Sequence, residues 1–195
     1  MRQNSWALSW IPGYRLKLIQ IIFVKRKVVG SIAALFKSRD ILPRDCLLAM
    51  YYAYVHSYLT YAVEIFGMTY MRFLCPLHRL QKRALRVILG YPPWESMRYK
   101  YVEMSILPYP LQIEMSVVTE IKRILMGLHP NLLNLSHSTS TVNTRGSHTQ
   151  LLILSAASCN QSRFSISNLG ATYWNKLPPA VRATSSLTIF KQNAK

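Results

Sequence analysis

The amino-acid sequence predicts a mostly α-helical fold with a small β-hairpin near its C-terminal end. Apolar residues recur at spacings of three, four and seven between residues 14 and 126, as they do along one face of a helix. Glycine and proline follow these stretches as helix stops. Beyond residue 150, two short apolar runs flank a polar segment, as in a hairpin. The 195-residue chain is long enough to bury roughly 70% of its unfolded surface.

The first two predicted helices lie before Gly67. One spans residues 14–37, with Gly30 in its middle. The other begins at Pro43, which suits a first helical turn, and is expected to end at Gly67. Asp45 follows Pro43 where a helix N-terminus favours negative charge. Tyrosines spaced along it are typical of an apolar core with hydroxyls at its rim, and a stacking surface for bases is the alternative. These are Tyr51, Tyr52, Tyr54, Tyr58 and Tyr61.

Two further helices have clear ends. The third spans residues 71–89 and is expected to stop at Gly90, before Tyr91-Pro92-Pro93. The fourth spans residues 108–126 and is expected to stop at Gly127. Residues 14–130 therefore form one predicted helical region, and residues 1–13 precede it as a separate segment.

The C-terminal part reads differently. Residues 131–150 are rich in Ser, Thr and Asn without any period, so they are expected to form a loop and the clearest internal boundary. In the last region, 151–195, the expected strands are 151–154 and 163–167. Two short helices, 170–177 and 186–192, are expected around Pro178-Pro179.

Charge is the strongest compositional signal. The chain has 24 Lys and Arg against 7 Asp and Glu, a formal net charge of +17, while half of its residues are hydrophobic. Such a surface calls for an anionic partner, either a phosphate backbone or an acidic membrane face. Composition does not choose between them. A transmembrane segment is not expected, because no apolar run reaches about 20 residues.

The residues for catalysis are missing from the sequence. Its seven carboxylates are scattered, whereas a polymerase or two-metal nuclease needs two or three converging on its ions. Glycine-rich phosphate loops, GxSxG motifs and Cys/His metal-ligand spacings are absent as well. We therefore expect no enzyme activity, no metal and no cofactor. The three cysteines show no disulfide pattern, which favours a reducing intracellular compartment, nucleus or cytoplasm.

The third helix carries the sharpest functional signal. Its predicted apolar stripe is Phe73, Leu77, Leu80, Ala84 and Val87, and a basic stripe is centred roughly 130° away. The basic stripe consists of Arg72, Arg79, Arg83 and Arg86, with Lys82 at its edge. Guanidiniums match phosphate oxygens bidentately, so the row can follow a nucleic-acid backbone. A solvated basic face is the alternative, and the run Lys25-Arg26-Lys27 is open to the same two interpretations.

Several motifs occur in a fixed order along the chain. The second helix carries Leu42-Pro43, Leu48, Tyr51-Tyr52, His56-Ser57-Tyr58-Leu59, Tyr61 and Glu64-Ile65-Phe66-Gly67. The third carries Leu80-Gln81-Lys82-Arg83-Ala84-Leu85-Arg86-Val87-Ile88. The tail carries Thr144-Arg145, Phe164-Ser165-Ile166, Gly170, Trp174-Asn175, Leu177-Pro178, Ser186-Leu187 and Phe190-Lys191. Over residues 28–195 this order resembles the region that follows the catalytic core in reverse transcriptases of non-LTR retrotransposons, of the jockey and CR1 kind.

The resemblance implies a fold and a role. In the parent protein, an endonuclease and a fingers-palm polymerase with an aspartate pair precede a helical thumb and a C-terminal extension. This chain would be a thumb-like bundle and that extension without the catalytic core. Its basic stripe would contact phosphates of an A-like RNA/DNA duplex, which is read by shape rather than by sequence. The fragment would bind nucleic acid and would not polymerise.

Two other hypotheses stay open. A small basic protein could lay its N-terminal helix on anionic lipid as a peripheral membrane protein. The chain could also be an inert relic of a transposon, whose helices have lost their docking partner.

Overall fold

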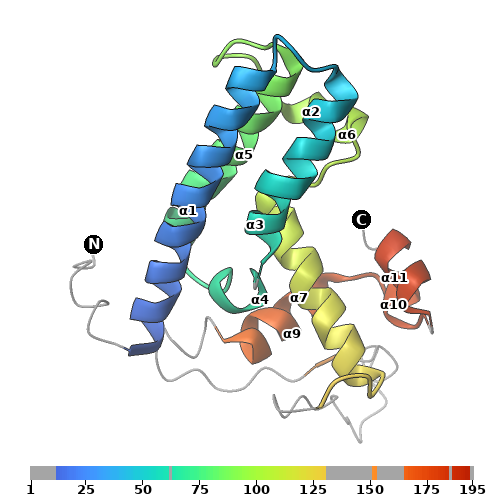
Figure 1. Cartoon of the computed structure of the whole chain (residues 1–195). Coiled ribbons are helices and arrows are strands. Elements are labelled where there is room, and N and C mark those ends of the chain that lie inside the picture. The colour runs from blue at the N-terminus through green and yellow to red at the C-terminus, as the bar shows by residue number, and fades with distance from the viewer. Residues whose placement is uncertain (1–11, 62, 131–150, 153–164, 185, 194–195) are drawn as a thin grey trace, which may run out of the picture. The chain divides into compact units, whose positions relative to one another are not determined.

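The computed structural model describes residues 12–61, 63–130, 151–152, 165–184 and 186–193, and most of them are helical (Figure 1). The predicted mostly α-helical class is therefore confirmed. The helices before residue 70 are α1 Pro12–Ser38, α2 Arg44–Met50, the π-helix η2 Tyr51–His56, α3 Ser57–Thr60 and α4 Val63–Phe66. The later ones are α5 Met71–Leu89, α6 Arg98–Glu103, α7 Tyr109–Leu125, α9 Ile166–Lys176, α10 Pro179–Arg182 and α11 Leu187–Asn193.

The chain divides into two compact units, residues 1–112 and residues 113–195, and each is described by itself. The loop predicted over residues 131–150 lies outside the described residues, so the boundary placed there stays a prediction.

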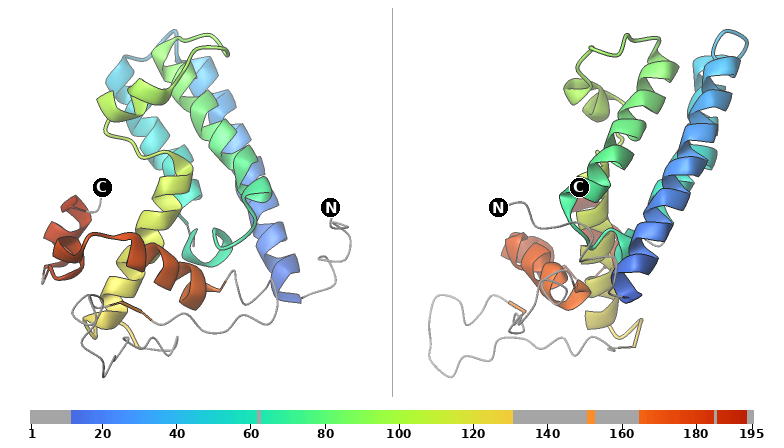
Figure 2. Two further views of the ribbon diagram at one scale, coloured as in Figure 1. Left: turned by 180° about the vertical axis from the view of Figure 1, so that it is seen from behind. Right: turned by 90° about the vertical axis from the view of Figure 1, so that its left-hand side faces the viewer.

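The first unit is a bundle in which η2 packs against both α1 and α5 (Figure 2). Its core takes Val24, Val28, Ile32 and Leu35 from α1, Leu47, Tyr51, Val55 and Leu59 from the second helical stretch, and Leu74, Leu77, Ala84, Leu85 and Ile88 from α5. Near the start of α1, Lys17 donates a hydrogen bond to the carbonyl of Met68, just before α5, at 3.0 Å. Near the end of α1, Phe36 and Val87 line the same cavities. Helices α1 and α5 therefore run parallel and end at the same end of the bundle.

Helix α5 begins and ends where the sequence predicts. Gly90 follows it in the left-handed conformation, with φ of 69°. The backbone N–H of Tyr91 donates to the Arg86 carbonyl at 2.9 Å and that of Gly90 to Val87 at 3.4 Å, the two bonds of a Schellman motif. After this turn, Tyr91 and the two prolines that follow it lie beside the last turns of α5.

The buried face of α5 differs from the predicted apolar stripe. Its buried residues are Leu74, Leu77, Gln81, Ala84, Leu85 and Ile88, whereas Phe73, Leu80 and Val87 are only half-buried. The centre of the face is rotated by roughly 70° from the predicted one, and it lies directly opposite the arginines. The polar Gln81 lies at this centre. A count of apolar residues alone therefore predicts the wrong position for the buried face.

Gln81 is fully buried and all of its hydrogen-bonding capacity is used. Its Nε2 donates to the Tyr51 hydroxyl at 3.2 Å and to the Leu107 carbonyl at 2.9 Å. Its Oε1 accepts from the Tyr101 hydroxyl at 3.2 Å and from the backbone N–H of Tyr109 at 2.8 Å. One side chain thus joins α5 to η2, to α6 and to the start of α7.

The second predicted helix contains a π-helical segment and stops earlier than expected, at Thr60. The N–H of Ser57 donates to the carbonyl of Tyr52, five residues back. Its buried residues, Leu47, Tyr51, Val55 and Leu59, are spaced by four throughout, and in an α-helix this spacing would drift by roughly 120° over three steps. The wider π-turn keeps them in line. As a result only Tyr51 of the five tyrosines is fully buried, Tyr58 is half-buried, and Tyr52, Tyr54 and Tyr61 are exposed.

The second unit is built from the part of α7 that begins at Ile113 and from α9, α10 and α11. At Gly170 an added Cβ would lie 2.4 Å from Cδ1 of Ile121, so the glycine allows α9 to approach α7 closely. Trp174 stacks on Phe190, with 5.9 Å between ring centroids. Buried Lys122 lies over both rings and donates to the Arg182 carbonyl at 2.9 Å. Two of the tail motifs therefore supply the centre of this unit.

The predicted hairpin is wrong for Ile166 and Ser167, which open α9. Ser165 is the N-cap, and its hydroxyl accepts from the backbone N–H of Asn168 at 3.3 Å, which starts a helix rather than a strand. The other predicted strand residues after Leu152 and before Ser165 lie outside the described part of the chain. The two helices expected around Pro178-Pro179 are confirmed as α9 and α11, and α10 adds a short turn between them.

Candidate nucleic-acid interface

The exposed face of α5 carries the predicted basic stripe. Arg72, Arg79 and Arg83 are exposed, and Arg86 and Lys82 are half-buried. Because this face lies opposite the buried one, packing the helix into the core turns the arginines outward.

A hollow at the shared end of α1 and α5 brings together three of these arginines and a fourth that the stripe did not include. This arginine cavity has a volume of about 720 Å³. It is lined by Phe36, Arg39, Arg79, Arg83, Arg86, Val87, Gly90, Tyr91, Pro92 and Pro93. Cations are favoured at this place even without a ligand, because the carbonyl ends of two helices converge on it.

Two of the four guanidiniums are held by the protein. Arg86 donates from Nε and Nη2 to the backbone carbonyl of Glu95, at 3.1 Å and 2.7 Å. The guanidinium of Arg39 stacks on the Phe36 ring, 4.3 Å from its centroid, and its Nε bonds Asp40 at 3.2 Å. These contacts fix where both charges stand at the rim of the arginine cavity.

Arg79 and Arg83 have no such attachment. Within the described residues, neither makes a hydrogen bond or an ion pair, although each side chain offers five N–H donors in a planar fork. Two adjacent, unpaired guanidiniums on neighbouring turns of a helix form a natural receptor for phosphate oxygens.

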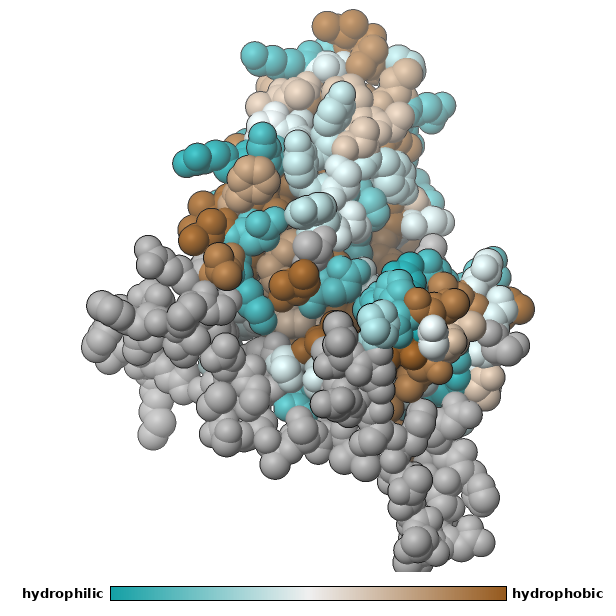
Figure 3. All heavy atoms as spheres, turned by 60° about the horizontal axis from the view of Figure 1, so that its bottom comes forward, coloured by the Kyte–Doolittle hydropathy of each residue, from teal (hydrophilic) through white to brown (hydrophobic). Residues whose placement is uncertain are grey.

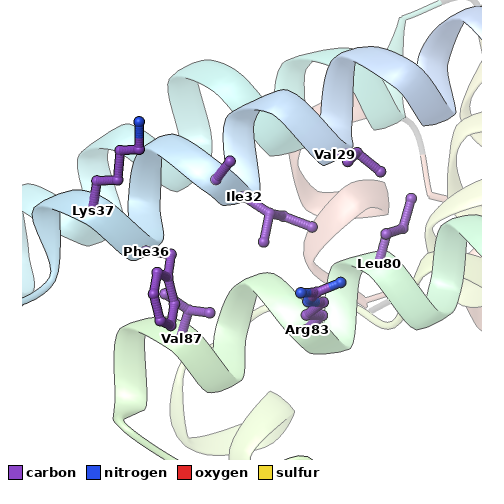
Figure 4. A pocket seen from close by; sticks show the side chains of 8 residues that line it. Val29, Ile32, Phe36, Lys37, Leu80, Arg83 and Val87 are labelled. Atoms are coloured by element: carbon purple, nitrogen blue, oxygen red, sulfur yellow. The ribbon is translucent and has the colours of Figure 1, made fainter.

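A second hollow adjoins the first between α1 and α5 (Figure 4). This apolar hollow has a volume of about 280 Å³. It is lined by Val29, Ile32, Ala33, Phe36, Lys37, Leu80, Arg83 and Val87. Figure 4 shows Phe36 beside Val87, with Arg83 one turn of α5 away from Val87 and facing α1. Phe36, Arg83 and Val87 line both hollows, so the two form one continuous site.

The remaining predicted site residues lie outside the arginine cavity. The guanidinium of Arg72 lies 5.3 Å from the ring centroid of Tyr70 and 4.7 Å from that of Phe73. Arg72 is about 10 Å along the helix from Arg79. Half-buried Lys82 lines neither hollow, but its charge assists burial in lowering the pKa of His78. Arg72 and Lys82 therefore flank the cavity.

The three residues of the predicted basic run in α1, Lys25, Arg26 and Lys27, are all exposed. Lys25 and Arg26 lie one turn before Val29 and so on the side of the apolar hollow, whereas Lys27 points the other way, with its ammonium 5.5 Å from the Phe23 ring centroid. The structure thus brings none of the three into the cavity.

Sequence reasoning missed Arg39, Phe36 and the Tyr91-Pro92-Pro93 wall. In the sequence the prolines predict only a helix stop, and nothing local shows that the ends of α1 and α5 meet. Figure 3 shows further apolar side chains exposed among polar ones on one face of the molecule. On α1 the exposed apolar residues include Leu16, Ile19, Ile22, Phe23, Val29 and Phe36.

In the described part of the chain, no three His, Cys, Asp or Glu side chains gather as metal ligands. None of its helices combines the length and the apolar character needed to cross a bilayer. Comparison with known proteins gives no match to any family model, curated protein or solved structure.

Proposed function

We propose that this chain is a nucleic-acid-binding fragment of a non-LTR retrotransposon reverse transcriptase, comprising the thumb and C-terminal extension without the polymerase core. The order of the sequence motifs supports the family. The observation that carries the binding function is the arginine cavity, in which two guanidiniums without partners among the described residues lie beside two fixed ones.

In this proposal Arg79 and Arg83 take phosphate oxygens directly. Arg39 and Arg86 supply positive potential from fixed positions. Arg72, Lys82 and the α1 run Lys25-Arg26-Lys27 extend the field along the strand and steer its approach. Binding of this kind is independent of sequence, because phosphates carry no base identity.

The proposal assigns no catalysis to the chain. Polymerisation requires carboxylates that hold two metal ions, and in the parent protein these belong to the preceding core. The exposed apolar row on α1 supports this origin, because a thumb separated from its palm leaves uncovered a face that the palm would cover.

Salt dependence of binding tests the proposal. Fluorescence anisotropy with a labelled oligonucleotide, repeated from 50 mM to 300 mM salt, gives the slope of log K against log salt. Each lost phosphate contact lessens this slope by about 0.9 on duplex. The double variant Arg79→Gln/Arg83→Gln is expected to lessen it by about 1.8, while far-UV circular dichroism stays unchanged.

A matched control removes the same charge elsewhere. Lys176 and Lys191 are exposed in the second unit, and Lys176→Gln/Lys191→Gln is expected to leave the slope within about 0.3 of the parent value. Equal losses in both double variants would assign binding to overall charge and contradict the cavity. An absence of binding at 50 mM salt would contradict nucleic-acid binding altogether. Arg86 is left intact because its removal would also free the loop at Glu95.

One observation favours a second candidate, a protein of the membrane surface. Helix α1 exposes Leu16, Ile19, Ile22 and Phe23 next to Lys25 and Arg26, the combination with which an interfacial helix binds anionic lipid. Flotation with phosphatidylserine vesicles distinguishes the two. A variant with Ile19→Ser, Ile22→Ser and Phe23→Ser should lose flotation if this candidate is correct, and should keep oligonucleotide binding if the arginine cavity is the site.

A further inference from the structure

The arginine cavity and the apolar hollow are concave, and their shape bears on which nucleic acid enters. A duplex presents its phosphates on a convex surface and keeps its bases stacked inside, so it touches the rim without filling the hollows. A single strand can turn one base out of its stack, which places a flat apolar ring next to a phosphate. The two adjoining hollows match such a nucleotide, because the apolar hollow can take the base and the arginine cavity beside it can take the phosphate.

The lining of the site suits flat rings. Phe36 belongs to both hollows and is 53% exposed, so much of its ring stays open although Arg39 stacks on it. Tyr91, Pro92 and Pro93 also line the arginine cavity. Aromatic faces and guanidinium planes are the surfaces on which unstacked bases lie in single-strand-binding proteins.

The dimensions of the two hollows favour a base over an acyl chain, which is the apolar group that accompanies a phosphate in phospholipids. The apolar hollow spans residues 29–37 of α1 and residues 80–87 of α5, about two turns of each helix. Its 280 Å³ falls just below the usual range for a ligand pocket, so by itself it suits one flat ring better than a long acyl chain. The arginine cavity, at 720 Å³, lies well within the range for a small ligand.

We propose that this paired site seats one unstacked nucleotide of a single strand, with its phosphate at Arg79 and Arg83 and its base against Phe36 in the apolar hollow. The inference rests on the proposed nucleic-acid binding and adds a preference, namely for single strands and overhanging ends over blunt duplex. The preference is independent of sequence, because every base has a flat face.

The test compares two ligands and three variants of the whole chain. A single-stranded 12-mer and a blunt 12-base-pair duplex are titrated at equal salt, and a 2-aminopurine in the single strand reports unstacking by a rise in fluorescence. Stacking contributes enough that losing it weakens binding about 5- to 150-fold. Phe36→Ala should therefore weaken single-strand binding by at least about fivefold and lose the fluorescence rise, and it should weaken duplex binding by less, because only the single strand loses a stacking surface while both lose the ring that holds Arg39.

A filling variant and a distant control complete the design. Ala33 is exposed at the apolar hollow, so Ala33→Phe should block the base without removing any contact, and it should reproduce the effect of Phe36→Ala. Phe23→Ala removes an exposed ring of α1 that lines neither hollow and should change nothing.

The outcomes separate the two proposals. Equal affinity for single strand and duplex, or unchanged single-strand binding in both Phe36→Ala and Ala33→Phe, would overturn the nucleotide site while leaving phosphate binding intact. Failure of both ligands to bind overturns the site together with the proposed function. Binding of anionic vesicles but of neither oligonucleotide would assign the site to lipid instead.

Discussion

The two faces of helix α5 treat polar side chains in opposite ways. On the buried face, Gln81 makes four hydrogen bonds, which engage both of its amide protons and both lone pairs of its oxygen. On the opposite face, Arg79 and Arg83 have no hydrogen-bond or ion-pair partner within the described residues. A polar group that the fold satisfies completely serves the fold, and one that the fold leaves unsatisfied beside a cavity is available to a ligand.

The difference is one of energy as well as geometry. Removing a partner from a buried polar group leaves its donors and acceptors desolvated, which costs about 1–3 kcal/mol for each group. Removing an exposed charge leaves only water-filled space. Mutations on the two faces should therefore affect different measurements, stability for one and binding for the other.

The largest expected effect is on stability, from Gln81→Leu. The substitution strands the hydroxyls of Tyr51 and Tyr101, the Leu107 carbonyl and the Tyr109 N–H, and should lower the free energy of unfolding by at least about 3 kcal/mol. Urea titration followed by circular dichroism measures the loss. A fall below about 1 kcal/mol would mean that the glutamine cluster is not a structural centre.

Alkaline pH should lower the free energy of unfolding through the same buried face of α5. Burial raises the pKa of Tyr51 to about 12, and it also raises the pKa values of Tyr101 and Tyr109. Between pH 10 and pH 12 the unfolded chain has already released the Tyr51 proton that the folded chain retains, so stability falls as pH rises. The fall due to Tyr51 is about 1.4 kcal/mol for each pH unit.

Urea midpoints between pH 9 and pH 12 check this dependence. Tyr51→Phe removes one titrating group, so its curve should be shallower than that of the parent over the same range. Parallel curves for the two proteins would show that Tyr51 ionises equally easily in the folded and unfolded states.

A smaller effect is expected at the junction between α5 and the arginine cavity. Gly90 has a φ of 69°, which a side chain disfavours, so Gly90→Ala should lower the free energy of unfolding by about 1 kcal/mol. Gly30→Ala is the control, because Gly30 lies in the middle of α1 with open space at its Cβ position. It should raise stability by about 0.5–1 kcal/mol. Equal signs for both substitutions would contradict the conformational argument.

The smallest effect on stability should come from the arginines. Arg79→Gln/Arg83→Gln is expected to change the free energy of unfolding by less than about 0.5 kcal/mol, since neither side chain has a hydrogen-bond or ion-pair partner to lose in the described part of the chain. The same urea titration measures it. A loss comparable to that of Gln81→Leu would show that these arginines stabilise the fold and would remove the contrast between the two faces.

Local sequence signals located the helices well and located their partners poorly. The ends of α5 follow from Gly90 and from the two prolines after Tyr91, because these stops act within a few residues. The place of Gln81 could not follow from hydropathy, because its burial depends on four partners that are distant in sequence. For the same reason the arginine stripe was found, whereas Arg39 and Phe36, which join it only through the parallel packing of α1 and α5, were not.

The π-helix at Tyr51–His56 has a consequence for the length of the chain. A stretch with buried residues at every fourth position contains one residue more than an α-helix with the same buried face requires. Removing exposed Ala53 would give the buried positions spacings of four, three and four, which an α-helix keeps on one side. A single-residue deletion, ordinarily among the most disruptive changes to a helix, should here yield a folded protein with a regular helix. The same four side chains would stay buried in both forms, because the residue that separates the two forms is exposed.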